Sequence, residues 1–136
     1  MQDFPLKRIL ILDNDEDVLV ALERVLENEN YATVTAVSHR EAWRMLSEGT
    51  FDLLVLDDHL SDKNAIEVLS ELRSSGMTPM VVVTYHRDPP AHQRAQLRSL
   101  GASALVNKRA HAALVEIVNY LLEQYGKGHH EFDTMT

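Results

Sequence analysis

Cysteine is absent from this sequence. Its absence excludes disulfide bonds, a thiolate nucleophile and cysteine-ligated zinc sites. Long apolar runs are also missing, since none approaches the roughly 18 residues that a membrane-spanning helix needs. The apolar segment at residues 8–12 meets acidic residues at once, which is not the pattern of a signal peptide. We therefore expect a cytoplasmic protein without membrane insertion.

Basic residues are few and scattered. Lysine and arginine total 13 against 21 aspartates and glutamates, which gives a formal net charge of -8. No stretch concentrates positive charge as a phosphate-tracking surface requires, so we expect no direct binding of nucleic acid. A chain of 136 residues with 45% apolar content can bury one continuous core. We expect one domain at residues 1–126 and a disordered polar tail at 127–136.

Five short apolar runs have the length and composition of β-strands: residues 8–12, 33–37, 53–56, 80–83 and 104–106. Apolar residues at helical spacing lie between and after them, at about 16–29, from Ser38 onward, from about 65 to Gly76, from Asp88 to Gly101 and at about 110–125. Ser38 and Glu41 have capping-box spacing, and Asp88 before Pro89 predicts an N-cap followed by a first-turn proline.

Strict alternation of strand and helix predicts the fold class. Strands that are apolar on both faces belong in a parallel sheet covered by helices on both sides. Five such units predict an α/β fold of the flavodoxin-like, doubly wound (βα)5 type, with a five-stranded parallel sheet of order 2-1-3-4-5. In that fold, ligands bind outside the carboxyl ends of the strands.

Polar side chains follow four of the predicted strands. Asp13, Asn14 and Asp15 follow the first, Asp57 and Asp58 the third, Thr84 the fourth, and Lys108 comes after the fifth. Convergent carboxylates raise one another's pKa unless a cation lies among them, and a site with oxygen ligands only suits Mg²⁺. A metal ion, an ammonium and a hydroxyl around a carboxylate would form a phosphoryl-transfer site.

The adjacent carboxylates Asp57 and Asp58 cannot both face this site. Successive side chains of a strand point to opposite faces of the sheet. Asp57 follows its strand as Asp13 follows the first, so we predict that Asp57 is the nucleophile. We expect Asp58 to be a solvated loop residue that faces elsewhere.

With these residues in place, the chain resembles the receiver domain of two-component response regulators over about residues 6–125. The resemblance lies in the stretch GASALVNK and in the order and spacing of five residues: Asp13, Asn14, Asp57, Thr84 and Lys108. The resemblance implies that Asp57 accepts a phosphoryl group from a histidine kinase or phosphotransfer protein.

The resemblance also assigns the other site residues and the partners. Asp13, Asn14, Asp57 and the backbone carbonyl of His59 would hold a weakly bound Mg²⁺ or Mn²⁺. Thr84 and Lys108 would contact the phosphoryl oxygens and start a conformational switch. The protein would not be an enzyme beyond self-phosphorylation and slow autodephosphorylation. It would act on a downstream effector protein, and a homodimer is compatible with the resemblance.

Several positions depart from the family's pattern. Asn14 replaces the second acid, so the site loses a negative charge and Mg²⁺ should bind more weakly; Asp15 is the candidate to compensate, but it is one residue out of register. The usual proline after the lysine is Arg109, and a cis bond there would cost about 3 kcal/mol, unless Lys108 approaches differently. The remaining departures are Ser61 and Ala65 in place of Pro and Gly, Leu105 in place of the switch aromatic, and Tyr85 in place of a small residue.

Two other functions are compatible with parts of the sequence. The departures favour a receiver-like interaction module that does not use phosphate. The stretch LDND also fits the Asp-x-Asp motif of haloacid-dehalogenase-like phosphatases, but these need further acids after the lysine, where only the helical Glu116 and Glu123 are available before the tail. His59 and His86 each lie two residues after a site residue, so we expect both at the mouth of the pocket.

Overall fold

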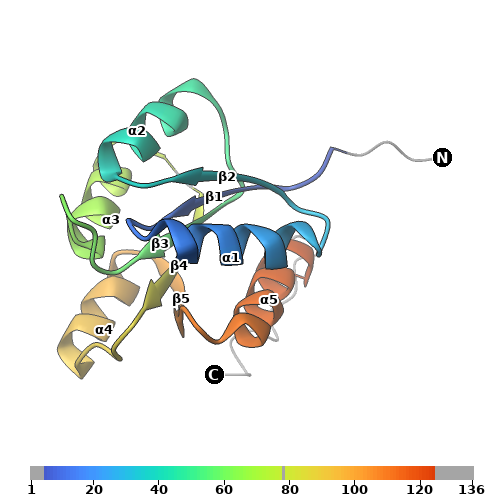
Figure 1. The fold of residues 1–136 in the computed structure, drawn as a ribbon. Coiled ribbons are helices and arrows are strands. Elements are labelled where there is room, and N and C mark those ends of the chain that lie inside the picture. The colour runs from blue at the N-terminus through green and yellow to red at the C-terminus, as the bar shows by residue number, and fades with distance from the viewer. Residues whose placement is uncertain (1–4, 78, 125–136) are drawn as a thin grey trace.

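The computed structural model describes residues 5–77 and 79–124. The strands are β1 (Arg8–Leu12), β2 (Ala32–Ala36), β3 (Leu53–Asp57), β4 (Met80–Tyr85) and β5 (Ala102–Asn107). The helices are α1 (Glu16–Glu27), α2 (His39–Glu48), α3 (Ala65–Ser74), α4 (Ala91–Ser99) and α5 (His111–Asn119), which continues as a π-helical turn at Tyr120–Gln124 (Figure 1). The tail predicted at 127–136 lies outside the described residues.

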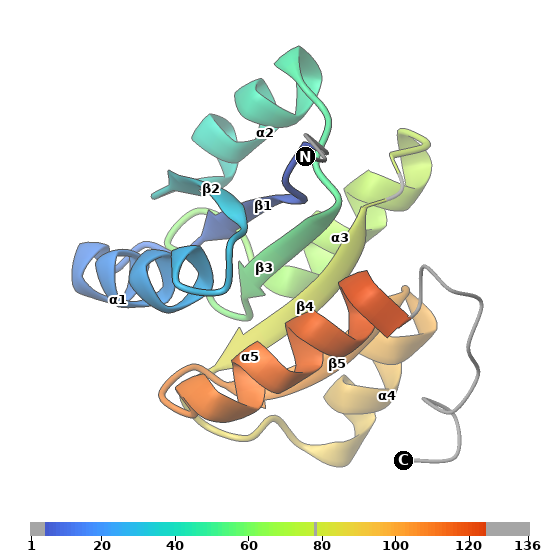
Figure 2. The same ribbon diagram turned by 90° about the vertical axis from the view of Figure 1, so that its right-hand side faces the viewer.

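All five strands are parallel and lie in the order β2-β1-β3-β4-β5, so the predicted topology is confirmed. Helices α1 and α5 cover one face of the sheet, and α2, α3 and α4 cover the other (Figures 1 and 2). Alternate strand residues serve the two cores: Ile11 and Val55 pack toward α1 and α5, whereas Leu12 and Leu56 pack toward α2, α3 and α4.

Two helices begin at residues whose side chains cap the helix N-terminus. The Ser38 hydroxyl accepts the backbone N–H of Glu41, as the spacing predicted. Asn64 and Glu67 form a complete capping box at the start of α3. Helix α3 begins at Ala65, where φ is not positive, so alanine replaces the family's usual glycine there without backbone strain.

The predicted start of α4 was wrong. The helix begins at Ala91, its N-cap is Pro90, and no side chain caps it. The reason is the double proline: a residue that precedes proline is driven out of the helical region, so Pro89 cannot open a helix when Pro90 follows. Asp88 instead forms an ion pair with Arg94 in the first turn of α4.

No helix among the described residues combines the length and apolar character needed to cross a membrane.

Candidate functional site

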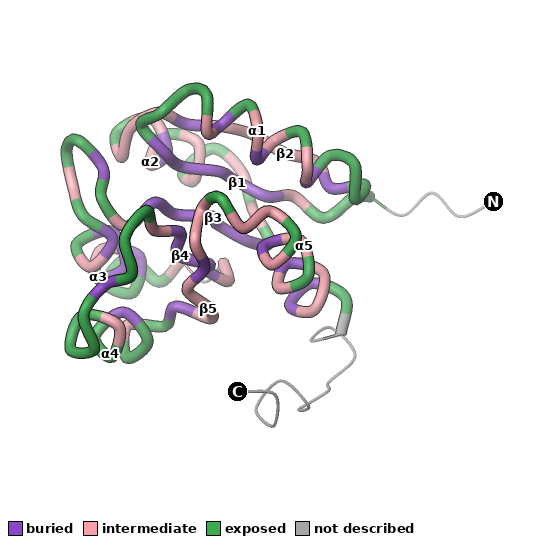
Figure 3. The backbone as a smooth tube through the Cα atoms, turned by 60° about the horizontal axis from the view of Figure 1, so that its bottom comes forward, coloured by how far each residue is buried: buried purple, intermediate pink, exposed green. Residues whose placement is uncertain are grey.

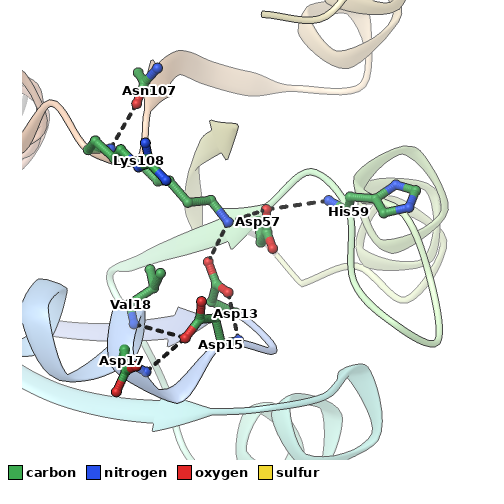
Figure 4. A network of polar contacts seen from close by, with 9 residues as sticks. Asp13, Asp15, Asp17, Val18, Asp57, His59, Asn107 and Lys108 are labelled. Carbon is green, nitrogen blue, oxygen red and sulfur yellow. Dashed lines mark hydrogen bonds and ion pairs between the residues drawn. The ribbon is translucent and has the colours of Figure 1, made fainter. Parts of the chain in front are cut away.

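Four polar residues lie at the carboxyl edge of the sheet: Asp13, Asp57 and Lys108, which Figure 4 shows close together, and Thr84 on the neighbouring strand β4. Asp57 is the last residue of β3 and lies opposite Thr84 of β4, while Asp13 and Lys108 directly follow β1 and β5. Each lies two residues beyond a strand residue that packs against α1 and α5, namely Ile11, Val55, Val82 and Val106. The alternation of the strands therefore directs all four side chains to the same side of the sheet.

The Lys108 ammonium joins the two carboxylates. Its Nζ lies 2.9 Å from Oδ2 of Asp13 and 3.0 Å from Oδ1 of Asp57. Both carboxylates are almost completely buried, with 1% and 3% of their surface exposed. Two buried negative charges and one positive charge leave the cluster one positive charge short of neutrality.

Burial raises the pKa of Asp57 to about 6. The hydrogen bond from Lys108 opposes this rise, and the negative charge of Asp13 adds to it. For Lys108, burial by itself would lower the pKa, but hydrogen bonds to Asp13 and Asp57 outweigh burial and raise it. At neutral pH, Asp57 is therefore an ionised carboxylate in a buried environment that disfavours its charge, and such an environment makes a carboxylate more reactive as a nucleophile.

Thr84 presents a buried hydroxyl to the same site. The residue is 1% exposed, and Oγ1 has no hydrogen-bond partner within the part of the chain that the structure describes. An unsatisfied buried hydroxyl costs about 1–3 kcal/mol, so it marks a position where a ligand oxygen would be stabilised.

The residues fit a hard divalent cation. Asp13 and Asp57 supply two buried carboxylates, and the exposed Asn14 follows Asp13 directly. Such an oxygen donor set, completed by water, is typical of Mg²⁺. Within the described ranges, no group of three or more His, Asp or Glu side chains is placed to hold a metal ion.

Asp15 does not replace the missing second acid. Its Oδ1 accepts the backbone N–H groups of Asp17 at 2.9 Å and Val18 at 3.4 Å, which makes Asp15 the N-cap of α1 (Figure 4). Its own N–H donates to Oδ1 of Asp13 at 2.9 Å. Asp15 therefore orients Asp13 and starts the helix, and the cluster keeps only two carboxylates.

The two histidines lie at the mouth of the site, as expected. His59 is exposed, and its backbone N–H points to Oδ1 of Asp57 at 3.5 Å (Figure 4). His86 is exposed and lines a cleft together with Lys108 and Arg109.

The expectation for Asp58 needs correction. Asp58 lines a pocket together with residues of α3 and α4, but it is half-buried and not a solvated loop residue, and its carboxyl still interacts with Asp57 and Lys108. Its N–H donates to the Thr84 carbonyl at 2.8 Å, and its carbonyl accepts the N–H of Ala65 at 3.1 Å, so the chain is held in place here. Burial raises the pKa of Asp58, against the opposing effects of Lys108 and of a hydrogen bond with Asp57.

Arg109 is accommodated without strain. The described residues contain no cis peptide bond, so the Lys108–Arg109 bond is trans. The backbone N–H of Lys108 donates to the Tyr85 carbonyl at 3.0 Å, and the N–H of Arg109 donates to Oδ1 of Asn107 at 2.8 Å. Proline could not make this second bond. Sequence reasoning missed Asn107, although an asparagine two residues before a free N–H is a signal for this turn.

We predict that Asn107→Ala lowers the free energy of unfolding by about 1 kcal/mol, because the Arg109 N–H loses its partner. Urea denaturation measures the change. Asn107→Asp keeps an acceptor and should remain close to the wild type. Equal stabilities of Asn107→Ala and the wild type would show that the turn does not depend on this bond.

Residues 9–119 match the family described as response regulator receiver domain. The chain is 33% identical over 119 residues to the transcriptional regulatory protein PrrA of Mycobacterium tuberculosis, which covers 88% of this chain and 51% of PrrA. It is 35% identical over 80 residues to the alginate biosynthesis transcriptional regulatory protein AlgB of Pseudomonas aeruginosa, covering 58% of this chain and 18% of AlgB. The chain thus spans about half or less of these relatives.

Solved structures show the same fold. A CheY-like receiver domain protein from Methanospirillum hungatei superposes with a TM-score of 0.81 at 25% identity, covering 92% of this chain and all of that one (100%). The response regulator TrrA of Thermotoga maritima, in complex with Mg(2+)-BeF, gives 0.75 at 29% identity, covering 86% of this chain and 100% of that one.

Proposed function

Since this chain belongs to the response regulator receiver domain family of two-component systems, we propose that Asp57 accepts a phosphoryl group from a histidine kinase or phosphotransfer protein. The observation that carries the proposal is the position of Asp57. It is buried between the Lys108 ammonium and the unpartnered Thr84 hydroxyl, at the edge of the sheet where a ligand can reach it.

In the proposed reaction, a carboxylate oxygen of Asp57 attacks phosphorus, and the bond from phosphorus to the donor breaks as the new P–O bond forms. With a phosphohistidine donor, the P–N electron pair returns to the imidazole, which takes a proton from solvent. Lys108 stays near the new acyl phosphate and neutralises its oxygens, while the Thr84 hydroxyl donates to one of them. Catalysis here is positioning and charge neutralisation.

We further propose that Asp13, Asn14, Asp57 and the backbone carbonyl of His59 hold Mg²⁺ or Mn²⁺. When bound, the ion neutralises the negative charge of the incoming phosphoryl oxygens. The solved complex of TrrA with Mg(2+)-BeF supports this assignment by analogy. Because Asn14 is neutral, the ion meets one negative charge fewer than a pair of acids would supply, so binding should be weak.

We predict that Asn14→Asp lowers the dissociation constant for Mg²⁺ by about ten-fold, since one added charge close to a divalent ion contributes roughly 1–2 kcal/mol near a protein surface. Isothermal titration calorimetry measures the constant. Asn28→Asp adds the same charge at the other end of α1 and serves as the control. Equal effects of the two variants would remove Asn14 from the metal site.

The output of the switch is proposed to be a changed affinity for a downstream effector protein in the cytoplasm. The relatives are transcriptional regulators, and this chain spans about half or less of their length. The alternative, an interaction module that ignores phosphate, draws on the departures at positions 14, 61, 65, 105 and 109. The retained cluster of Asp13, Asp57, Thr84 and Lys108 favours the phosphorylated switch.

The phosphatase hypothesis lacks support at the site. Glu116 is an exposed residue of α5, and Glu123 accepts a hydrogen bond from Tyr31 on the α1 and α5 side of the sheet. The family to which the chain belongs consists of regulators and not of classical enzymes.

The test of the proposal is intact-protein mass spectrometry after incubation with acetyl phosphate, with and without Mg²⁺. We expect one phosphoryl adduct in the wild type with Mg²⁺ and none in Asp57→Asn. A histidine kinase phosphorylated on its own histidine provides a second donor in case the small donor is too slow. Failure with both donors would favour the phosphate-independent module.

A further inference from the structure

A second pocket lies on the α3 and α4 side of the sheet, next to the phosphoryl site. It has a volume of about 210 Å³ and opens between the start of α3 and the first turns of α4, which lie side by side (Figure 2). Asp58, His59 and Asn64 line it from the β3–α3 connection, and Gln93 lines it from α4. Asp57, Thr84 and Lys108 do not line it, but it adjoins the phosphoryl site, because His59, whose carbonyl is a proposed metal ligand, is among its lining residues.

The floor of this pocket is apolar. Ala65 and Leu97 are buried members of the core beneath α3 and α4, and Ile66 packs against that core. Asp58 follows Leu54 and Leu56 at two-residue spacing along the chain, and both leucines are buried in the core. A carboxylate therefore occupies the next position of an otherwise apolar series. Half-burial of a carboxylate beside an apolar floor is costly unless a cation or a donor satisfies it, and Lys108 and a hydrogen bond with Asp57 supply part of that compensation.

Asp58 is the only formally charged side chain among the residues that line the pocket, and no lysine or arginine is among them. The Asn64 side-chain oxygen is already engaged, because it accepts the N–H of Glu67 at 2.9 Å. The exposed Gln93 amide can turn its oxygen toward the opening. The pocket therefore combines one negative charge with the Gln93 amide, which can accept a hydrogen bond, and it has no lysine or arginine among its lining residues.

We propose that this pocket binds an organic cation, a guanidinium or primary ammonium on a short apolar stem. The charge would pair with Asp58, and the stem would lie on Ala65, Ile66 and Leu97. The volume is below the roughly 300–1,000 Å³ of sites for larger ligands, so it suits a group of the size of one side chain. Such a group comes either from an arginine or lysine of a protein or from a free amine.

The N-terminal end of helix α4, which borders the pocket, leaves room for a ligand to enter. Of its residues only Leu97 is buried, and no side chain caps its N-terminus (Figure 3). Its C-terminal end is fixed to α3, because Arg73 donates to the carbonyl oxygens of Leu100 at 2.8 Å and Gly101 at 3.3 Å. The end of α4 that borders the pocket is thus its less constrained end.

The pocket is also connected to the phosphoryl site. Asp58 follows Asp57, and its N–H donates to the carbonyl of Thr84 at 2.8 Å. If the proposed function holds, phosphorylation of Asp57 adds negative charge beside the pocket and should strengthen binding of the cation by a few-fold. By thermodynamic reciprocity, the bound cation would favour the phosphorylated state to the same degree.

The experiment is a titration of the unphosphorylated, ¹⁵N-labelled full chain with butylguanidinium, followed by amide chemical shifts. We expect shifts at Asp58, Gln93 and Leu97, with a dissociation constant of about 1–10 mM, as befits so small a ligand. Neutral butylurea should bind at least ten-fold more weakly. A capped Gly-Arg-Gly peptide distinguishes the sources, because equal or tighter binding of the peptide indicates a protein side chain, and binding of the free cation alone indicates a small amine.

Substitutions test whether the Asp58 carboxylate is the group that binds the cation. Asp58→Asn should weaken binding of butylguanidinium at least ten-fold, whereas Asp62→Asn, which removes the same charge from an exposed part of the same connection, should not. Gln93→Lys, which places an ammonium at the rim, should also block binding and covers the case in which Asp58→Asn fails to fold. Undiminished binding to Asp58→Asn, or loss of binding in Asp57→Asn, would overturn the proposal. The test uses unphosphorylated protein, so its outcome is independent of whether Asp57 is a phosphoacceptor.

Discussion

Lys108→Ala is expected to lower the free energy of unfolding by about 3 kcal/mol at pH 7 in the presence of a chelator. The substitution leaves the carboxylates of Asp13 and Asp57 buried without the ammonium that lies 2.9 and 3.0 Å from them. Removal of one partner from a buried ion pair costs about 3–5 kcal/mol, and the 12% exposure of the Lys108 side chain places this case near the lower end.

Magnesium should reverse much of this loss. In Lys108→Ala the two carboxylates have no other cation, so added Mg²⁺ should raise the urea midpoint of the variant more than that of the wild type. Acid should act in the same direction, because protonation of Asp57 removes one of the unpaired charges. A variant that is destabilised equally with and without Mg²⁺ would show that Lys108 stabilises the fold by packing and not through the carboxylates.

Asp57→Asn is expected to raise the free energy of unfolding by about 3 kcal/mol at pH 7.5 without Mg²⁺. The folded state raises the pKa of Asp57 from 3.8 to about 6, so ionisation is disfavoured by folding. A difference of one pKa unit corresponds to about 1.4 kcal/mol. Asparagine keeps the shape of the side chain and an oxygen acceptor for Lys108, but removes the buried charge.

The stability difference between Asp57→Asn and the wild type should depend on pH, and the direction of the pKa shift sets the sign of that dependence. A carboxyl whose pKa is raised on folding stabilises the protein below its unfolded pKa, and this contribution is lost as pH rises through the folded value. The advantage of Asp57→Asn should therefore be near zero at pH 4, grow up to about pH 6 and then stay constant. The exposed Asp62→Asn should show no such profile. A variant no more stable than the wild type at pH 7.5 would contradict the placement of Asp57 as a strained carboxylate.

Much of the fold was predictable because its signals are local and repeated. Five apolar runs of strand length alternate with helical spacing, and an alternating chain of this kind has one common sheet order. The start of α4 was missed because Asp88 before Pro89 resembles a cap, while the rule that governs the result is the effect of Pro90 on the residue before it.

The members of the site could be predicted from strand alternation and position, but their environment could not. Asp13, Asp57, Thr84 and Lys108 fall on one face because each continues the same register. The half-burial of Asp58 depends on contacts with α3 and α4 that are distant in the sequence, so no local pattern predicts it. Asn107 is different, because its oxygen accepts the N–H of Arg109 only two residues further on, a local signal that sequence reasoning missed.

The most direct test of the central claim is to locate the phosphoryl group itself. Borohydride reduces an aspartyl phosphate to homoserine, so treatment of the protein after incubation with a phosphodonor and Mg²⁺, followed by peptide sequencing by mass spectrometry, identifies the residue. We predict homoserine at position 57 and unmodified aspartate at positions 13 and 58. Homoserine at position 58 or 13, with Asp57 intact, would contradict the account.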